Sequence, residues 1–209
     1  MRNKKFQKGL SLIEIAIGIV ILGILISGMT LPLAAQMQTR QLKENEAYLE
    51  QIREALLGYV IQHGVLPCPS LDQNGIAASN CLDWSETQGF LPWKTLQVRA
   101  KDAWQTAWMY RANRAFVNAA QPIYSETVPD TTLPIQISDL NGDPLHEVSQ
   151  KNLPCFVVIS AGKNQRFDGE NQNHDAIYHA NIQTPNFDDQ TIWSGSPQLF
   201  YYLTLAGKI

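Results

Sequence analysis

The sequence predicts an α+β protein in which a long N-terminal helix packs on a small antiparallel sheet. Residues 10–63 form one continuous helical pattern, which is apolar throughout at first and then apolar on one side. The last hundred residues instead hold short apolar segments separated by turn-forming residues, a pattern typical of antiparallel strands. With 209 residues and 44% hydrophobic composition, the chain can form one soluble core after the helix.

The first apolar segment, residues 10–35, is long enough to cross a membrane as a helix. Between residues 10 and 33 the only charged side chain is that of Glu14, and about 20 apolar residues span a bilayer core. Residues 1–9 hold four basic side chains and no acidic one, which keeps them in the cytoplasm. We therefore expect a leader at 1–9, a single transmembrane helix at 10–35 and an extracytoplasmic globular domain at 64–209.

Residues 36–63 continue the same helix with an amphipathic pattern. Apolar residues recur at spacings of three, four and seven, which place them on one face of the helix. We expect this face to pack on the soluble domain, and Gly64 supplies a stop signal. The apolar positions are Leu42, Leu49, Ile52, Leu56, Tyr59 and Val60.

The rest of the chain divides into a loop and a sheet. Residues 64–101 are rich in Pro, Gly, Asn, Asp and Ser, and we expect a long loop with short helical turns. Apolar segments bounded by turn residues follow, and each is expected to form an antiparallel strand. These segments are residues 107–117, 133–138, 155–160, 176–182 and 198–205.

The N-terminal residues resemble a known processing signal. A basic leader ends at Gly9, apolar residues follow, and Glu14 is the fifth residue counted from Leu10. This order resembles the class III signal of type IV pilins and type II secretion pseudopilins, although Leu10 replaces the phenylalanine most common there. The resemblance implies a pilin-like fold, cleavage between Gly9 and Leu10 by prepilin peptidase, methylation of the Leu10 amine and a role for Glu14 in assembly. The alternative is a plain signal anchor in which Glu14 gains only from the helix dipole.

Two later segments extend the resemblance with less specific motifs. Residues 102–111 are similar to the stretch that opens the sheet in major pseudopilins, with Asp102, Trp104 and Tyr110 matching. Residues 157–164 resemble the strand and turn that precede the calcium loop in that family. The alternative explanation of Trp104 and Tyr110 is that they are core aromatics with a polar edge.

The resemblance implies a structural subunit of a type IV pilus or a type II secretion pseudopilus. Such a subunit is inserted in the inner membrane, keeps its globular domain in the periplasm or outside the cell, and polymerises with other pilin subunits at an assembly platform. Secretion, adhesion, motility and DNA uptake all stay open, as does a major or minor role. The alternative is a membrane-anchored extracytoplasmic binding protein or enzyme that does not polymerise. Catalysis is not expected, because the sequence has no nucleophile elbow, zinc-protease motif or phosphate-binding glycine loop.

The charge balance argues against nucleic acid as a partner of the globular domain. The chain has 16 basic and 19 acidic residues, and four of the basic residues lie in the leader. Without the leader the side-chain net charge is −7, which disfavours binding to phosphate backbones.

Residues 166–193 concentrate oxygen-bearing side chains. Calcium binds about six to eight oxygen atoms, often from carboxylates and amides on one loop, and the order of residues resembles the pseudopilin calcium loop. Asp168 and Asp175 are the expected ligands, and a solvated acidic loop is the equal alternative. His174 and His179 are five apart, which puts them on opposite faces of a strand and argues against zinc. The candidate oxygen donors are Asp168, Glu170, Asn171, Asn173, Asp175, Asp188 and Asp189.

The three cysteines face an oxidising compartment if the topology is as expected. Cys68 and Cys81 close a loop of 14 residues, and a bridge over about 15 residues contributes roughly 3 kcal/mol in the chain-entropy model. We expect this pair to form a disulfide and Cys155 to be a buried thiol. Pairing of Cys155 with Cys68 or with Cys81 is the alternative.

Overall fold

The computed structural model describes residues 11–83, 87–118, 123, 134–146, 152–180 and 182–209, and for residues 25–34 it describes the backbone alone. The chain forms two compact units, Met1–Leu42 and Lys43–Ile209, and each is described by itself. The first helix contributes residues to both units.

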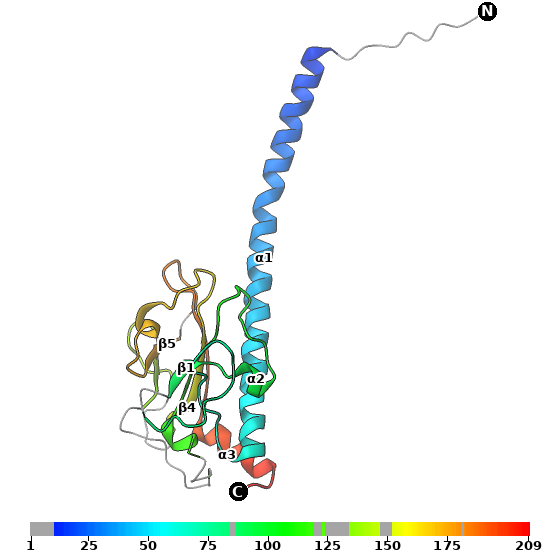
Figure 1. Cartoon of the computed structure of the whole chain (residues 1–209). Coiled ribbons are helices and arrows are strands. Elements are labelled where there is room, and N and C mark those ends of the chain that lie inside the picture. Colours follow the sequence, from blue (N-terminus) through cyan, green and yellow to red (C-terminus); the bar gives the residue numbers. More distant parts are fainter. Residues whose placement is uncertain (1–10, 84–86, 119–122, 124–133, 147–151, 181) are drawn as a thin grey trace, which may run out of the picture. The chain divides into compact units, whose positions relative to one another are not determined.

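A long N-terminal helix is followed by short strands, short helices and a final helix (Figure 1). This order confirms the predicted α+β class, with a long helix and a small antiparallel sheet. The elements are α1 (Leu12–His63), β1 (Gln88–Phe90), α2 (Trp93–Leu96), β2 (Met109–Ala112), η2 (Arg114–Phe116), β3 (Gln136–Ser138), β4 (Pro154–Ser160), η3 (Gly169–Gln172), β5 (Ile177–His179), β6 (Gln190–Gly195) and α3 (Ser196–Leu205).

Helix α1 ends at the residue where the sequence predicts its end. Gly64 follows the last helical residue with a φ of 76°, a conformation that glycine adopts without the steric cost of a Cβ. The N–H of Gly64 donates to the carbonyl of Val60 at 2.7 Å. This left-handed cap satisfies one of the carbonyls that a helix end leaves without a partner.

A four-stranded antiparallel sheet in the order β1-β2-β4-β6 forms the centre of the second unit. Strand β4 lies between β2 and β6, and all of its residues are buried. Its side chains alternate between two hydrophobic clusters: Phe156 and Val158 belong to one, and Val157 and Ile159 to the other. Strands β3 and β5 pair in parallel, and Tyr178 of β5 joins the second cluster.

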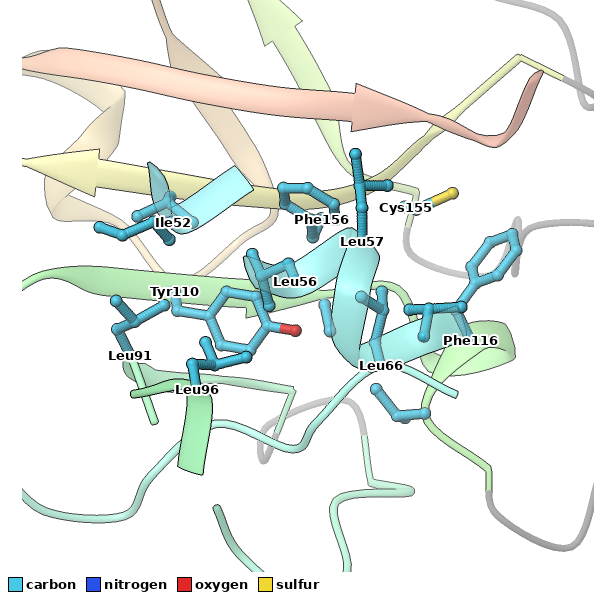
Figure 2. Close-up of a cluster of buried hydrophobic side chains, with 14 of the residues drawn as sticks. Ile52, Leu56, Leu57, Leu66, Leu91, Leu96, Tyr110, Phe116, Cys155 and Phe156 are labelled. Carbon is cyan, nitrogen blue, oxygen red and sulfur yellow. The ribbon is translucent and has the colours of Figure 1, made fainter. Parts of the chain in front are cut away.

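The residues of α1 in the second unit pack on one face of this sheet. Figure 2 shows Ile52 and Leu56 in one cluster with Tyr110 of β2 and Phe156 of β4. Leu56 has no exposed surface. Burying a Leu or Ile side chain contributes about 1.5–3 kcal/mol, so the spacing of apolar residues along α1 fixes the helix to the sheet.

A disulfide joins Cys68 to Cys81, whose Cα atoms are 5.7 Å apart, and Cys155 is a buried free thiol. The closed loop is bound to the sheet by backbone hydrogen bonds. The N–H of Ser70 donates to the carbonyl of Phe90 at 2.8 Å, and the N–H of Phe90 donates to the carbonyl of Ser70 at 3.0 Å. Strand β1 therefore has β2 on one side and Ser70 on the other.

Residues 198–205 lie in a helix, so the predicted strand is wrong. Helix α3 begins after the extended Gly195, and Pro197 occupies its first turn, where the fixed φ of proline suits a helix. Leu199 and Leu203 are four residues apart and both 1% exposed. The apolar segment therefore buries one face of a helix instead of alternate positions of a strand.

The strands also differ from the prediction in three other respects. Strand β1 lies in the segment expected to be a loop, β6 covers residues for which the sequence predicts no strand, and β3 pairs with β5 in parallel. Strand β6 is at the edge of the sheet and is mostly half-buried, so its residues have mixed polarity and no apolar run marks it. Strand β1 has three residues, too few for a periodic signal.

The packing of α1 defines the cost of removing one of its buried side chains. Leu56→Ala leaves a cavity in the cluster and should lower the free energy of unfolding by about 2–5 kcal/mol. Glu54→Ala, at an exposed position of the same helix, should change it by no more than about 0.5 kcal/mol. Thermal denaturation of the purified full-length protein, followed by circular dichroism, measures both changes, and equal effects would contradict this packing.

Candidate functional site

The predicted processing site lies at the edge of the described residues. Gly9 and Leu10 are outside them, and the description begins at Ser11. The carbonyl of Ser11 accepts the N–H of Glu14 at 3.0 Å and that of Ile15 at 3.2 Å. Glu14 is therefore in the first turn of α1 with an exposed side chain, where the helix dipole favours a negative charge.

The first turns of α1 expose apolar side chains on all sides. Every residue from 12 to 24 is exposed, and the large apolar side chains among them have exposed fractions of 48–88%. A helix that is apolar all round requires an apolar environment.

Among the residues whose side chains are described, no helix has a stretch both long enough and apolar enough to cross a membrane.

A second candidate site lies where β4 ends and β6 begins. Ser160, the last residue of β4, pairs with Gln190, the first residue of β6. Because the two strands are antiparallel, the chain that leaves β4 at residue 161 and the chain that enters β6 at residues 188–189 meet at the same end of the sheet.

Two buried polar side chains anchor these strand ends. The carboxylate of Asp102 accepts the hydroxyl of Ser160 at 2.6 Å and two backbone N–H groups of its own turn at 2.8 and 2.9 Å. Burial raises the pKa of Asp102, and these hydrogen bonds oppose the rise. The side chain of Asn45, in α1, donates to the side chain of Gln190 at 2.5 Å and accepts the N–H of Ala103 at 3.0 Å. The turn, the helix and both strands are thus held together.

Three carboxylates gather at this end of the sheet. Asp168 precedes η3, and Asp188 and Asp189 precede β6. One carboxylate oxygen from each lies within 4.8 Å of the other two. Asp189 is 1% exposed, and the other two are half-buried. Gly162 allows the two segments to approach, because a Cβ at that position would collide with the carbonyl of Asp188.

Backbone N–H groups bind some of the carboxylate oxygens and leave others without a donor. The N–H of Asp168 donates to Oδ2 of Asp189 at 2.9 Å, and the N–H of Asp188 donates to Oδ2 of Asp168 at 3.0 Å. The N–H of Asn164 donates to Oδ2 of Asp188 at 2.9 Å. Within the described residues, Oδ1 of Asp188 and Oδ1 of Asp189 are buried and receive no hydrogen bond.

The electrostatics of the group call for a positive partner. Burial raises the pKa of Asp189 to about 7, although hydrogen bonds from the Asp168 N–H and the Asn171 amide oppose the rise. Burial also raises the pKa of Asp188. A buried carboxylate requires a proton, a donor or a cation. Because calcium prefers carboxylate oxygens, the donor set of Asp168, Asp188 and Asp189 fits this ion.

The structure assembles a different set of carboxylates from the expected pair of Asp168 and Asp175. Asp168 belongs to the group of three, whereas Asp175 does not. Asp175 is exposed, and its Oδ1 accepts the N–H of Ile177 at 3.1 Å at the start of β5. The signal that could have selected Asp188 and Asp189 is their position directly before a strand, but β6 carries no apolar run that would reveal it.

His174 and His179 are not part of the carboxylate group. His174 instead lines a cavity of about 210 Å³, together with Phe90, Met109 and Phe167. Of the described residues that line this cavity, His174 alone has a titratable side chain. The cavity therefore offers no paired acid and base for general acid–base catalysis.

The comparisons with known proteins concern the N-terminal segment. The family model of the prokaryotic N-terminal methylation motif matches residues 4–30, which include the end of the basic leader, Gly9 and the first turns of α1. No curated protein and no solved structure matches the chain. The motif confirms the resemblance seen in the N-terminal residues and supports a type IV pilin-like prepilin.

Proposed function

We propose that the chain is a structural subunit of a type IV pilus or a type II secretion pseudopilus. In this proposal residues 10–35 insert in the inner membrane, prepilin peptidase cuts between Gly9 and Leu10, and the new amine of Leu10 is methylated. The mature subunit then polymerises with other pilin subunits through its N-terminal helix at the assembly platform. The observation that carries the proposal is the methylation motif at residues 4–30.

The apolar surface of α1 supports this function. The described residues from 12 to 24 include nine large apolar side chains that are exposed, and burying each Leu or Ile contributes about 1.5–3 kcal/mol. Lipid provides an apolar environment before assembly, and the helices of neighbouring subunits provide one in the fibre. Polymerisation then moves the helix from one apolar environment to another.

Glu14 carries a negative charge that has to enter the fibre core when the helix moves from lipid into the polymer. An ionised Asp or Lys at the centre of a membrane helix costs roughly 2.5–3.5 kcal/mol, and a position near the end of the segment costs less. Leader cleavage creates a positive amine on Leu10. We propose that Glu14 pairs with the Leu10 amine of a neighbouring subunit, because a charge left alone in an apolar fibre core is strongly destabilising.

In this proposal the globular domain lies in the periplasm or outside the cell, and the N-terminus lies in the cytoplasm. The basic leader supports this orientation. The disulfide between Cys68 and Cys81 supports it independently, because such bonds persist in oxidising compartments.

The alternative from another class is a membrane-anchored extracytoplasmic binding protein or enzyme that does not polymerise. Such a protein needs no partner for Glu14 and no cleavage at Gly9. The methylation motif favours the structural subunit, and the two experiments on Gly9 and Glu14 below separate the two functions.

We also propose that the globular domain binds a calcium ion through Asp168, Asp188 and Asp189. The observation that carries this second function is Oδ1 of Asp189, which is buried without a donor beside two other carboxylates. When bound, the ion supplies the positive charge that allows all three groups to ionise. Because the ligands come from two segments of the chain, binding also ties the segment after β4 to the start of β6.

Leader cleavage defines the N-terminus of the mature protein. In cells with a prepilin peptidase, the chain should begin at an N-methylated Leu10, and Gly9→Leu should retain the leader. Gly18→Ala, at a position in α1 where a Cβ meets no atom within 4 Å, should be processed normally. Mass spectrometry of the membrane fraction measures all three; a retained Met1 in the unaltered chain would reject this cleavage site.

Substitution of Glu14 should impair assembly without impairing insertion. Glu14→Gln and Glu14→Leu should both reach the membrane fraction, since the change removes a charge from an apolar segment, but both should fail to enter fibres. Glu46→Gln, at an exposed position further along α1, is the matched control and should assemble. Crosslinking to other pilin subunits measures incorporation. Wild-type incorporation of Glu14→Leu would show that Glu14 gains only about 0.3–1 kcal/mol from the helix dipole and has no role between subunits.

Calcium should raise the melting temperature of the domain. At a concentration 100 times the Kd, an ion that binds the folded state alone adds about 2.7 kcal/mol, which corresponds to roughly 5–10 °C for a domain of this size. Calorimetry of the detergent-solubilised full-length protein, with calcium or with chelator, measures the difference. Asp189→Asn should abolish this difference in melting temperature, and Asp175→Asn should retain it. Equal midpoints with and without calcium in the unaltered protein would overturn the second function.

Without calcium, the stability of the domain should depend on pH through Asp189. In chelator the stabilisation by protonated Asp189 is full below its ordinary pKa of 3.8 and is lost as the pH rises through about 7. Asp189→Asn should therefore reduce the loss of stability over this pH range.

A further inference from the structure

Asn171 contacts both the acidic group and β5 through its side-chain amide. It lies in η3 and is 1% exposed. Its Oδ1 accepts the backbone N–H of His179 at 2.8 Å. Its Nδ2 donates to the carbonyl of His179 at 3.1 Å and to Oδ2 of Asp189 at 2.7 Å.

The chemistry of an amide accounts for this arrangement. An Asn side chain has two N–H donors and one carbonyl acceptor. One donor and the acceptor pair with the two backbone groups of His179, which fixes the plane of the amide, and the second donor is then directed at Asp189. An Asp at position 171 has no donor for either partner, and a Leu of similar size has no polar atom.

The hydrogen bonds on Asp189 are distributed unequally between its two oxygens. Oδ2 receives two donors, the Asn171 amide and the N–H of Asp168 at 2.9 Å. Oδ1 receives none and is buried. One oxygen is therefore occupied by the protein, and the other is left for a ligand.

We propose that Asn171 is the positioning residue of the cation site, which holds Oδ2 of Asp189 so that Oδ1 stays available to a cation bound with Asp168 and Asp188. The inference rests on the proposed calcium function. Groups that orient a metal ligand without touching the metal typically change metal affinity about 10- to 100-fold when they are removed. Asn171 thus acts on affinity through Asp189.

The test is calcium titration calorimetry on the detergent-solubilised full-length chain. Asn171→Leu should weaken calcium binding about 10- to 100-fold, and Asn171→Gln, which keeps the amide but displaces it by one methylene, should weaken it by less. Asn173→Leu is the matched control, because Asn173 is exposed and donates to Glu170 instead of to the carboxylate group. Its affinity should equal that of the unaltered chain.

The readouts separate positioning from a general effect on folding. A residue that only stabilises the fold lowers the melting midpoint in chelator and leaves the affinity of the folded protein unchanged. Should Asn171→Leu fail to fold, the affinity of Asn171→Gln decides the question. Unaltered affinity in a folded Asn171 variant overturns the inference alone, whereas the absence of calcium binding by the unaltered chain overturns the proposed calcium function and the inference together.

Discussion

The pairing of β4 with β6 at Ser160 and Gln190 is the constraint on which the acidic site depends. It brings together two segments that are more than twenty residues apart along the chain, and the carboxylates belong to these segments. Asp102 and Asn45 bind the two strand ends through side chains that are buried and hydrogen-bonded. Since buried polar groups of this kind are costly to leave unpaired, the register of the strands and the geometry of the site are linked.

Glu14 and Asp189 follow the same physical logic in different units of the chain. The carboxylate of Glu14 lies in an apolar helical segment that we propose to enter lipid and the fibre core, and that of Asp189 lies in the interior of the domain. In our proposals the first obtains its positive partner from another subunit and the second from an ion. Such a carboxylate stabilises the protein when its positive partner, a neighbouring subunit or an ion, is bound, and it destabilises the protein when that partner is absent.

The sequence predicts those features that rest on long periodic patterns or on local residue chemistry. In the second half of α1 the apolar residues recur with helical spacing over about five turns, a glycine follows as a stop, and the helix ends at His63 as predicted. The segment 198–205 shows the opposite case, because eight mainly apolar residues fit a strand or a buried helix face equally well. Asp168 could be predicted as a site residue from its acidic surroundings. Asp188 and Asp189 are among the candidate oxygen donors, but they could not be selected from the sequence, because their position is set by the register of β6, an edge strand with a polar composition.

The hydrogen bonds between Ser70 and Phe90 have a consequence for how copies of the domain meet. An open strand edge is a template on which another chain can add a strand, and crowded subunits with such an edge are prone to uncontrolled aggregation. The disulfide-closed loop occupies the backbone groups of Phe90 at the outer edge of β1. The loop that the disulfide closes therefore covers the outer edge of β1 at Phe90, where a strand from another copy of the domain would otherwise find free backbone N–H and carbonyl groups.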